Sequence, residues 1–403
     1  MNKVRAIIGA FVANLIFKVI TLPCWQDWMI KMLIQLKRFF QKETVFCVSL
    51  VLTLLSTLAV RPDAVYLTYP DYRTLALLFC LMLIVSGFQS LGVFERLGHA
   101  LLHRAGNLRS LSIVLVLLCF FSSMIITNDV TLITFVPFTL LVFRMIGKTE
   151  RVLLLVVLET IAANLGSMAT PIGNPQNLYL FSISSLSLGQ FAWAVMPYAG
   201  LSLILLLAVL LLQRNEPLPA SVSVSPVNKA HLFPALLPFL FLLILCLLVV
   251  FRVISYVPAL IGVTAVVLVV NRKLFRSVDY CLLFTFLFFF IFIGNLKRIP
   301  ALNTALLSLV NGHELCTGIL ASQIISNVPA AILLSGFTQD YATLLTAVNL
   351  GGLGTLIASL ASLIAFKFYG SAYPERKGAF LKVFTLFNVG FLLVLTGLAL
   401  ILI

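Results

Sequence analysis

Two short polar stretches interrupt the apolar segments of this chain and have the composition of solute-binding sites. The first runs from Asn164 to Asn177 and contains two glycines, two prolines, three asparagines, a glutamine and a threonine. It lies inside an apolar span, residues 153–181, that is long enough to cross a bilayer. Pro171 and Pro175 each remove a backbone donor and clash with the preceding turn, so the helix is expected to break. Since irregular backbone at membrane depth is tolerated only against protein or a watery cavity, the stretch predicts a binding site.

The same pattern occurs a second time near the end of the chain. Residues 348–357 repeat residues 163–172, with three matched pairs of polar or small residues: Asn164 and Asn349, Gly166 and Gly351, Thr170 and Thr355. Upstream, residues 322–327 match residues 123–128, and each copy ends in a hydroxyl residue followed by asparagine: Thr127-Asn128 and Ser326-Asn327. Because both elements keep their order in the two copies, the sequence predicts an internal duplication.

We interpret the upstream copies as the tips of two re-entrant helical hairpins, whose second arms begin at the tip. Asn128 or Asp129 is expected to cap one of these arms, and Ser326 or Asn327 the other. Helix N-termini present unpaired amides and about half a positive charge, which attract anions. The carbonyls freed in the two breaks suit a small hard cation such as Na⁺. The pattern therefore predicts a centre that holds an anion and a coupling cation without a buried Lys or Arg.

Two acidic residues, Asp129 at the first tip and Glu159 in the first broken helix, lie at the predicted membrane depth. Ionisable groups there are costly and usually functional, so both are candidate coupling-ion residues. The alternative is structural: Asp129 only caps a helix, and Glu159 pairs with a neighbouring helix. Asn164 and Asn349 have the same two interpretations, as ligands near the breaks or as hydrogen-bonding contacts between helices.

The composition is that of a membrane protein. Hydrophobic residues make up 61% of the 403 and charged residues 10%, and the mean hydropathy is +1.13. These values predict an all-α polytopic membrane protein. The seven cysteines are scattered without a Cys-x-x-Cys pair, which favours buried thiols over disulfides or metal sites. No cleaved signal peptide is expected, because the N-terminus lacks a short apolar region followed by an Ala-x-Ala-like cleavage site.

Charge and hydropathy divide the chain into four parts. These are an N-terminal extension with a basic amphipathic helix (residues 1–43), a first repeat (44–213), a cytoplasmic linker (214–230) and a second repeat (231–403). Most of the 27 Lys and Arg fall on the ends assigned to the cytoplasm, which is a positive-inside bias. The bias places the base of the first hairpin inside and that of the second outside, so the repeats are expected to be inverted. A basic face against anionic lipid accounts for the net charge of +14 without a nucleic-acid partner.

Taken together, these motifs resemble the ion transporter superfamily, which includes divalent-anion/sodium symporters, citrate-transporter-like proteins, arsenite permeases and some sodium/proton antiporters. The resemblance covers about residues 44–403. In the dicarboxylate branch both tips read Ser-Asn-Thr and contact substrate carboxylates; here they read Thr-Asn-Asp and Ser-Asn-Val. The matching pairs imply a substrate-binding role for Thr127, Asn128, Ser326 and Asn327. The Asn-Asp of the first tip is closer to the arsenite permeases, whereas residues 170–177 are closer to the dicarboxylate branch.

The sequence as a whole predicts a secondary transporter of the cytoplasmic membrane, not an enzyme, that moves a small anion coupled to Na⁺ or H⁺. Thr170 and Thr355 complete the predicted substrate site, and Asn164, Gly166, Asn349 and Gly351 join the two acids as predicted coupling-ion residues. No cofactor is expected, and the absence of a P-loop argues against direct ATP drive. The expected partners are the anion, membrane lipid and, by the resemblance, a second copy in a homodimer. The alternatives are a sodium/proton antiporter that uses Asp129 and Glu159, and a channel or membrane receptor.

Overall fold

The computed structural model describes residues 35, 43–93, 96, 106–217 and 232–403 of the chain. Two predicted features lie outside these ranges for most of their length. They are the basic amphipathic helix of the N-terminal extension and the linker beyond Pro217.

Regular structure in the described ranges is helical. The first part of the chain contains α3 (Thr44–Ala59), η1 (Ala64–Thr68), α4 (Tyr72–Ser90), α6 (Leu108–Ile126), α7 (Asn128–Met145), α8 (Val152–Ser167), α9 (Pro175–Ile183) and α10 (Leu188–Leu211). The second contains α11 (Leu232–Val250), α12 (Tyr256–Asn271), η2 (Arg272–Ser277), α13 (Tyr280–Lys297), α14 (Pro300–Val310), α15 (Glu314–Ile325), α16 (Asn327–Ser335), α17 (Tyr341–Leu350), η3 (Leu356–Ala358), α18 (Leu360–Ala372), η4 (Pro374–Arg376) and α19 (Lys377–Leu402).

The prediction of a polytopic all-α membrane protein is confirmed. Within the described residues, seven helices are long and apolar enough to cross a bilayer. Many of their side chains are exposed leucines, valines and isoleucines, such as Ile204 on α10 and Leu386 on α19. In a membrane these faces meet lipid, so their exposure requires no partner protein.

Local sequence signals explain where the helices next to the first break begin. Asn174 precedes α9, and its side-chain oxygen accepts a bond from Asn177 N at 2.9 Å. Pro175 fills the first position of that helix, where no intrahelical donor is needed. Ser187 and Gln190 form a reciprocal capping box at the start of α10. Pro175, one of the two prolines that break the apolar span, therefore also begins the next helix, α9.

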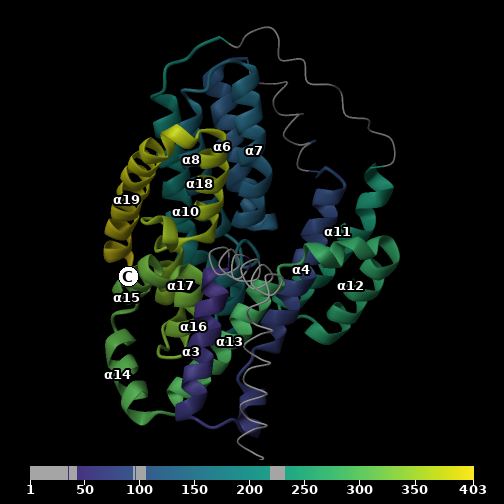
Figure 1. Cartoon of the computed structure of the whole chain (residues 1–403), viewed down its shortest axis with the longest axis vertical. Coiled ribbons are helices and arrows are strands. Elements are labelled where there is room, and N and C mark those ends of the chain that lie inside the picture. Colours follow the sequence, from purple (N-terminus) through teal and green to yellow (C-terminus); the bar gives the residue numbers. More distant parts are fainter. Residues whose placement is uncertain (1–34, 36–42, 94–95, 97–105, 218–231) are drawn as a thin grey trace, which may run out of the picture.

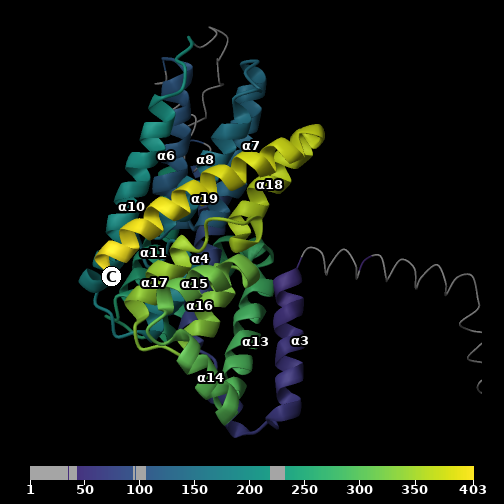
Figure 2. The same ribbon diagram turned by 90° about the vertical axis from the view of Figure 1, so that its left-hand side faces the viewer.

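The helices pack as two groups (Figure 1). In one, α4 packs on α11, α12 and α13, and α3 packs on α13. In the other, α6–α10 pack with α15–α19. The groups meet where α13 contacts α16 and α4 contacts α9. Figures 1 and 2 show α6, α7 and α8 in one half of the second group along its long axis, and α15, α16 and α17 in the other.

An arginine joins the two groups at one end of α9. Arg252 follows α11 with φ of 63°, a backbone conformation that is uncommon for residues other than glycine. Its guanidinium donates to the carbonyl oxygens of Phe181, at 2.8 Å, and Ser184, and lies 5.3 Å from the Phe181 ring centroid. These carbonyls end α9, so the arginine complements the negative end of the helix dipole.

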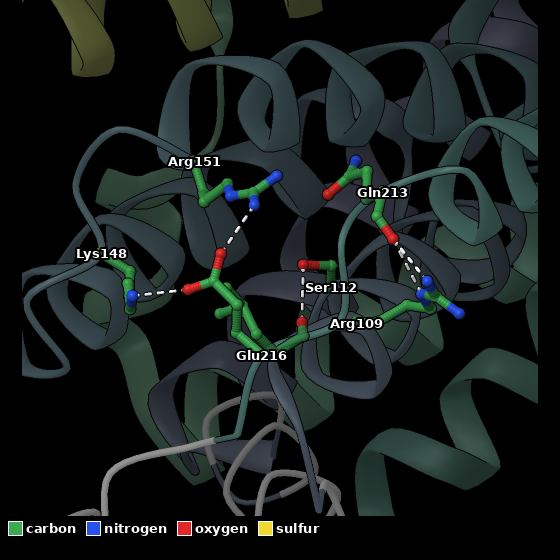
Figure 3. A network of polar contacts seen from close by, with 7 residues as sticks. Arg109, Ser112, Lys148, Arg151, Gln213 and Glu216 are labelled. Atoms are coloured by element: carbon green, nitrogen blue, oxygen red, sulfur yellow. Dashed lines mark hydrogen bonds and ion pairs between the residues drawn. The ribbon is translucent and has the colours of Figure 1, made fainter.

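A polar network fixes the segment that follows α10 (Figure 3). Glu216 bonds Lys148 at 2.5 Å and Arg151 at 2.8 Å, both near the turn between α7 and α8. Arg109, at the start of α6, donates to Gln213 O at 2.6 Å. Gln213 and the described start of the linker are thus tied to the bases of three helices.

Candidate functional site

The two hairpin tips have nearly the same unusual backbone. Thr127 between α6 and α7 has φ 70° and ψ 152°, and Ser326 between α15 and α16 has φ 74° and ψ 155°. A positive φ in a β-branched residue such as Thr127 is strained and occurs mostly where function or packing requires it. Asn128 and Asn327 follow directly, each 4% exposed, as the first residues of the second arms.

The expectation that tip side chains cap the second arms is wrong. The N-cap residues are Thr127 and Ser326, and neither side chain makes a capping hydrogen bond. The physical reason is the positive φ, since an N-cap residue normally adopts the β region when its side chain bonds the first turn. The first-turn amides of both arms therefore lack a cap from these residues.

A chain of hydrogen bonds connects the two tips. Asn128 Nδ2 donates to Asn164 Oδ1 at 3.0 Å, and the same oxygen accepts Ser359 Oγ at 2.9 Å. Ser359 lies at the end of the second break, and Ser326 Oγ donates to the carbonyl of the preceding residue, Ala358, at 3.3 Å. The predicted residues Asn128, Asn164 and Ser326 thus meet around the second break.

Two side-chain atoms of the residues that form this hydrogen-bond chain have no hydrogen-bond partner. Asn128 Oδ1 and Asn164 Nδ2 are both buried without a hydrogen bond. One is an acceptor and the other a donor, on side chains that are bonded to each other. Buried polar atoms are normally paired, so these two point to a polar ligand that bonds both.

The two broken helices brace each other reciprocally. Asn174 Nδ2 donates to Asn349 Oδ1 at 3.0 Å, and Ser359 Oγ donates to Asn164 Oδ1 at 2.9 Å. In each break the donor follows the matched asparagine by ten residues, and each bond crosses to the other broken helix. Asn349 Nδ2 also donates to Asn177 Oδ1 at 2.6 Å. The two breaks are therefore held together by side-chain amides and one hydroxyl.

The predicted threonines and glycines of the breaks face the hairpins. Thr170 Oγ1 donates to Met124 O at 2.5 Å, and Thr355 Oγ1 donates to Gln323 O at 3.2 Å. A Cβ on Gly166 would lie 2.7 Å from Ser123 Oγ, and a Cβ on Gly351 would lie 2.6 Å from the matched Ser322 Oγ. These residues hold the breaks against the hairpins. Their substrate and coupling-ion roles stay predictions.

Asn327 also lies against a break. A Cβ on Gly352 would approach Asn327 Nδ2 to 2.8 Å, and Ser326 Oγ lies 3.5 Å from Asn327 Oδ1. The second tip is therefore packed on the backbone of the second break, as the first tip is bonded to Asn164.

The two acids lie in different places. Asp129 adjoins Asn128 at the first tip, and its Oδ1 is buried without a partner. Glu159 is fully buried on α8, where Oε1 accepts Thr139 Oγ1 at 2.5 Å and Oε2 has no partner. Thr139 follows Asn128 by eleven helical residues, or roughly 16 Å of rise. The structure thus places Asp129 at the tip and Glu159 well away from it.

Several residues of this centre were not among the predicted site residues. Asn174, Asn177, Gln323 and Ser359 all bond across a break or between the breaks. Asn174 and Asn177 were visible in the polar stretch, and Gln323 in the matched hairpin segment. For Ser359 the signal was its spacing of ten residues from Asn349, equal to that between Asn164 and Asn174.

A cavity of about 520 Å³ opens elsewhere, between the start of α10, the start of α17 and the end of α19. Gln190, Trp193 and Asp340 are among the residues that line it. None of the predicted site residues lines this cavity, so it does not correspond to the centre at the tips.

Comparison with known proteins agrees with this architecture. Residues 32–343 match the citrate transporter family. The chain belongs to this family. An uncharacterized transporter of Methanocaldococcus jannaschii is 32% identical over 330 residues, covering 82% of this chain and 89% of the relative. An inner membrane protein of Escherichia coli is 34% identical over 301 residues, covering 74% and 80%. A silicon efflux transporter of Oryza sativa is 30% identical over 143 residues, covering 34% and 29%. The chain is therefore a multi-pass membrane transporter.

Proposed function

We propose that this transporter moves a small oxygen-rich anion, a di- or tricarboxylate or an inorganic oxyanion, across the cytoplasmic membrane, coupled to Na⁺ or H⁺. The observation that carries the proposal is the pair of tips joined through Asn164, with a buried donor and a buried acceptor left unpaired. Uncapped helix N-termini beside them favour negative charge. The family whose model matches the chain is named for citrate, which is an oxygen-rich anion.

The proposed architecture is two inverted halves, residues 44–213 and 231–403, joined by the cytoplasmic linker at 214–230. The matched tip conformations and the reciprocal bonds between the breaks support it. Alternating access then requires movement of the group containing both breaks against the group of α3, α4 and α11–α13. Anionic lipid at the cytoplasmic face and a second copy of the chain are the proposed partners.

The test is a thermal-shift screen of the purified full-length protein, followed by uptake into proteoliposomes. Citrate, malate, phosphate, arsenite and silicate are the probes, each with and without Na⁺ and at two pH values. A ligand that binds the folded state raises the melting temperature with its concentration. We expect at least one oxyanion to stabilise the protein and to show saturable transport. The absence of any stabilisation or transport across the panel would refute the proposal.

A sodium/proton antiporter is the second candidate, because the acids that it would use each have a buried oxygen without a partner. These are Asp129 Oδ1 and Glu159 Oε2. An isolated carboxyl oxygen in a membrane interior is costly unless a proton or cation is bound there. If the protein is such an antiporter, the anions of the panel would not change its melting temperature or be transported, whereas Na⁺ would alter the H⁺ flux.

A further inference from the structure

The carbonyl groups freed in the first break are already bonded to a side chain. Asn177 Nδ2 donates to Met168 O and Thr170 O, both at 3.0 Å, and lies 3.4 Å from Ser167 O. These are three of the carbonyls that a cation in the break would use, because they follow the end of α8. An amide nitrogen carries two donors, so it can bond the two nearer carbonyls, those of Met168 and Thr170, without an ion.

The second break has the same arrangement. Gln323 Nε2 donates to Gly351 O at 2.8 Å and Leu353 O at 2.9 Å. The other end of this amide is also fixed, because Gln323 Oε1 accepts Thr355 N at 2.9 Å. Since carbonyl oxygens only accept and the backbone N–H only donates, the two ends of the amide cannot be exchanged.

The orientation of the Asn177 amide in the first break is also fixed by its hydrogen bonds. Asn177 Oδ1 accepts Asn349 Nδ2, and that nitrogen also donates to Leu345 O at 2.8 Å. The Asn177 nitrogen therefore has to face the break carbonyls. Asn177 is fully buried, so water does not compete for these bonds.

The two amides come from positions that are not equivalent. In the matched numbering of the halves, the counterpart of Gln323 is Met124, and the counterpart of Asn177 is Ser362. Asn177 belongs to a broken helix, whereas Gln323 belongs to a hairpin arm. Each half thus fills its own carbonyl cluster with a different side chain.

Both breaks are closely packed around their amides. A Cβ on Gly354, whose φ is +100°, would lie 2.4 Å from Gln323 Oε1. A Cβ on Gly173 would lie 2.1 Å from Ser167 O. An added ion at these carbonyls would have to displace the amide that is bonded there.

We propose that the amides of Asn177 and Gln323 stand in the positions where a coupling cation would bind, and that transport by this chain does not depend on Na⁺. The inference rests on the proposed transport function and concerns its coupling ion. The break carbonyls do not fit Na⁺, because they already accept hydrogen bonds from side-chain amides that are part of the protein. A side chain cannot dissociate with the substrate, so these two sites cannot link a sodium flux to transport.

The first experiment compares thermal unfolding of the purified full-length protein in NaCl and in choline chloride at equal ionic strength. A bound ion stabilises the folded state in proportion to ln(1 + [L]/Kd), so a sodium site raises the melting temperature as NaCl is titrated in. We expect no such shift, and less than about a twofold effect of Na⁺ on the affinity for citrate or any other anion that binds. A saturable rise of the melting temperature with Na⁺ would overturn the proposal, even if the ion bound at the tip oxygens instead of in the breaks.

The variants Gln323→Glu and Asn177→Asp keep the shape of each side chain and replace the donor by an acceptor. Oxygen then faces the break carbonyls, and a cation is needed between them. We expect each variant to melt at a lower temperature and to gain stabilisation by Na⁺ that the wild type lacks. Gln323→Met introduces the residue found at the matched position, Met124, and removes the donor without adding charge. This variant should gain less stabilisation by Na⁺ than the carboxylate variants. Folded carboxylate variants without any Na⁺ response would overturn the assignment of these positions.

These results separate the inference from the proposed function. If no anion binds in either salt, the transport proposal fails, while the Na⁺ titration of the protein alone still reports on the breaks. If an anion binds only in the presence of Na⁺, the transport proposal survives and the present inference fails.

Discussion

At the scale of single residues, the side-chain contacts that join the two tips are made by amides and hydroxyls rather than by charged groups. Asn128 and Asn164 share one hydrogen bond and leave one acceptor and one donor free. Such a pair recognises a group with both lone pairs and hydrogens, such as a hydrated or partly protonated oxyanion. Negative charge is then balanced by the first-turn amides of the second arms rather than by a basic side chain.

The first prediction concerns the two tip asparagines. Asn128→Ala and Asn327→Ala should each weaken binding of the transported anion by about tenfold to a hundredfold, since a lost bond in a buried site costs about 1–3 kcal/mol. Titration of the purified variants with the anion found in the thermal-shift screen measures this. Ser308→Ala, at an exposed position on α14, is the control. Wild-type affinity in both variants would contradict a shared site.

The second prediction separates the two candidate functions through Asp129. A carboxylate beside an anion repels it unless a proton or cation neutralises it, so Asp129→Asn should leave anion binding intact or stronger and less dependent on pH. In an antiporter, the same change removes a ligand of the exchanged ion, and ion-linked transport should stop. Anion binding measured across pH for the wild type and the variant decides between them. Glu150→Gln, in the exposed turn before α8, is the matched control.

At the scale of elements, the two broken helices form one braced unit. Asn174 makes three side-chain bonds, to Asn349, to Ser167 Oγ and to the backbone N of Asn177. Ser359 makes one, to Asn164 Oδ1, which keeps a second donor in Asn128. The two sides of the brace therefore differ in strength although their spacing along the chain is the same.

The third prediction follows from this difference. Asn174→Ala should lower the free energy of unfolding by about 1–3 kcal/mol, because it leaves buried partners unpaired. Ser359→Ala should cost less, since Asn164 Oδ1 remains bonded. Chemical or thermal unfolding of both variants beside Ser308→Ala measures the order. Equal stability of Asn174→Ala and Ser308→Ala would show that the brace contributes nothing.

Much of this element scale was predictable from sequence, because the interruptions have strong local signals. Pro171, Pro175 and the glycine-rich repeat located both breaks, and the repeated hydroxyl-Asn pairs located both tips. The bonding partners were not predictable. Which amide reaches which carbonyl depends on how two distant halves pack, and Gln323 has no amide counterpart in the first half. The tip capping was mispredicted because nothing in the sequence Thr-Asn-Asp or Ser-Asn-Val requires a positive φ at the hydroxyl residue.

At the scale of the whole molecule, ion pairs among the described residues lie at helix ends. Asp63 pairs with Arg298 at one end of α13, and Glu216 pairs with Lys148 and Arg151 near the α7–α8 turn. These groups are partly exposed, so each pair contributes little to stability alone. These ion pairs hold connecting segments against helix ends at the two predicted membrane faces.

The fourth prediction is a pH dependence at Glu216. Hydrogen bonds from Lys148 and Arg151 hold the pKa of this carboxyl below its usual range. Its contribution to stability is therefore complete above the ordinary pKa of about 4.3 and is lost as the pH falls through the lowered value. The melting temperature of Glu216→Gln should lie below that of the wild type by an amount that is equal at about pH 6 and pH 8. The gap should narrow as the pH falls below about 4 and close below the lowered pKa. A difference in melting temperature that changes between about pH 6 and pH 8 would assign the effect to another titrating group.

The last prediction tests the inverted arrangement itself. The charge asymmetry places the segment after α10 in the cytoplasm, and the arrangement of the halves places the turn after α14 outside the cell. Asn215 and Asn311 are exposed residues in these two segments. A cysteine at Asn311 should react with a membrane-impermeant thiol reagent in intact cells, and a cysteine at Asn215 only after the cells are opened.

This experiment needs a background in which Cys24, Cys281 and Cys316 are replaced by serine. Cys316 is exposed on α15, Cys281 is partly exposed on α13, and Cys24 lies outside the described residues. The buried thiols, such as Cys119 and Cys246, do not require replacement. Labelling of both positions in intact cells, or of neither, would mean that the two hairpins enter from one side. The reciprocal bonds between Asn174 and Asn349 and between Ser359 and Asn164 would then need an explanation other than inverted halves.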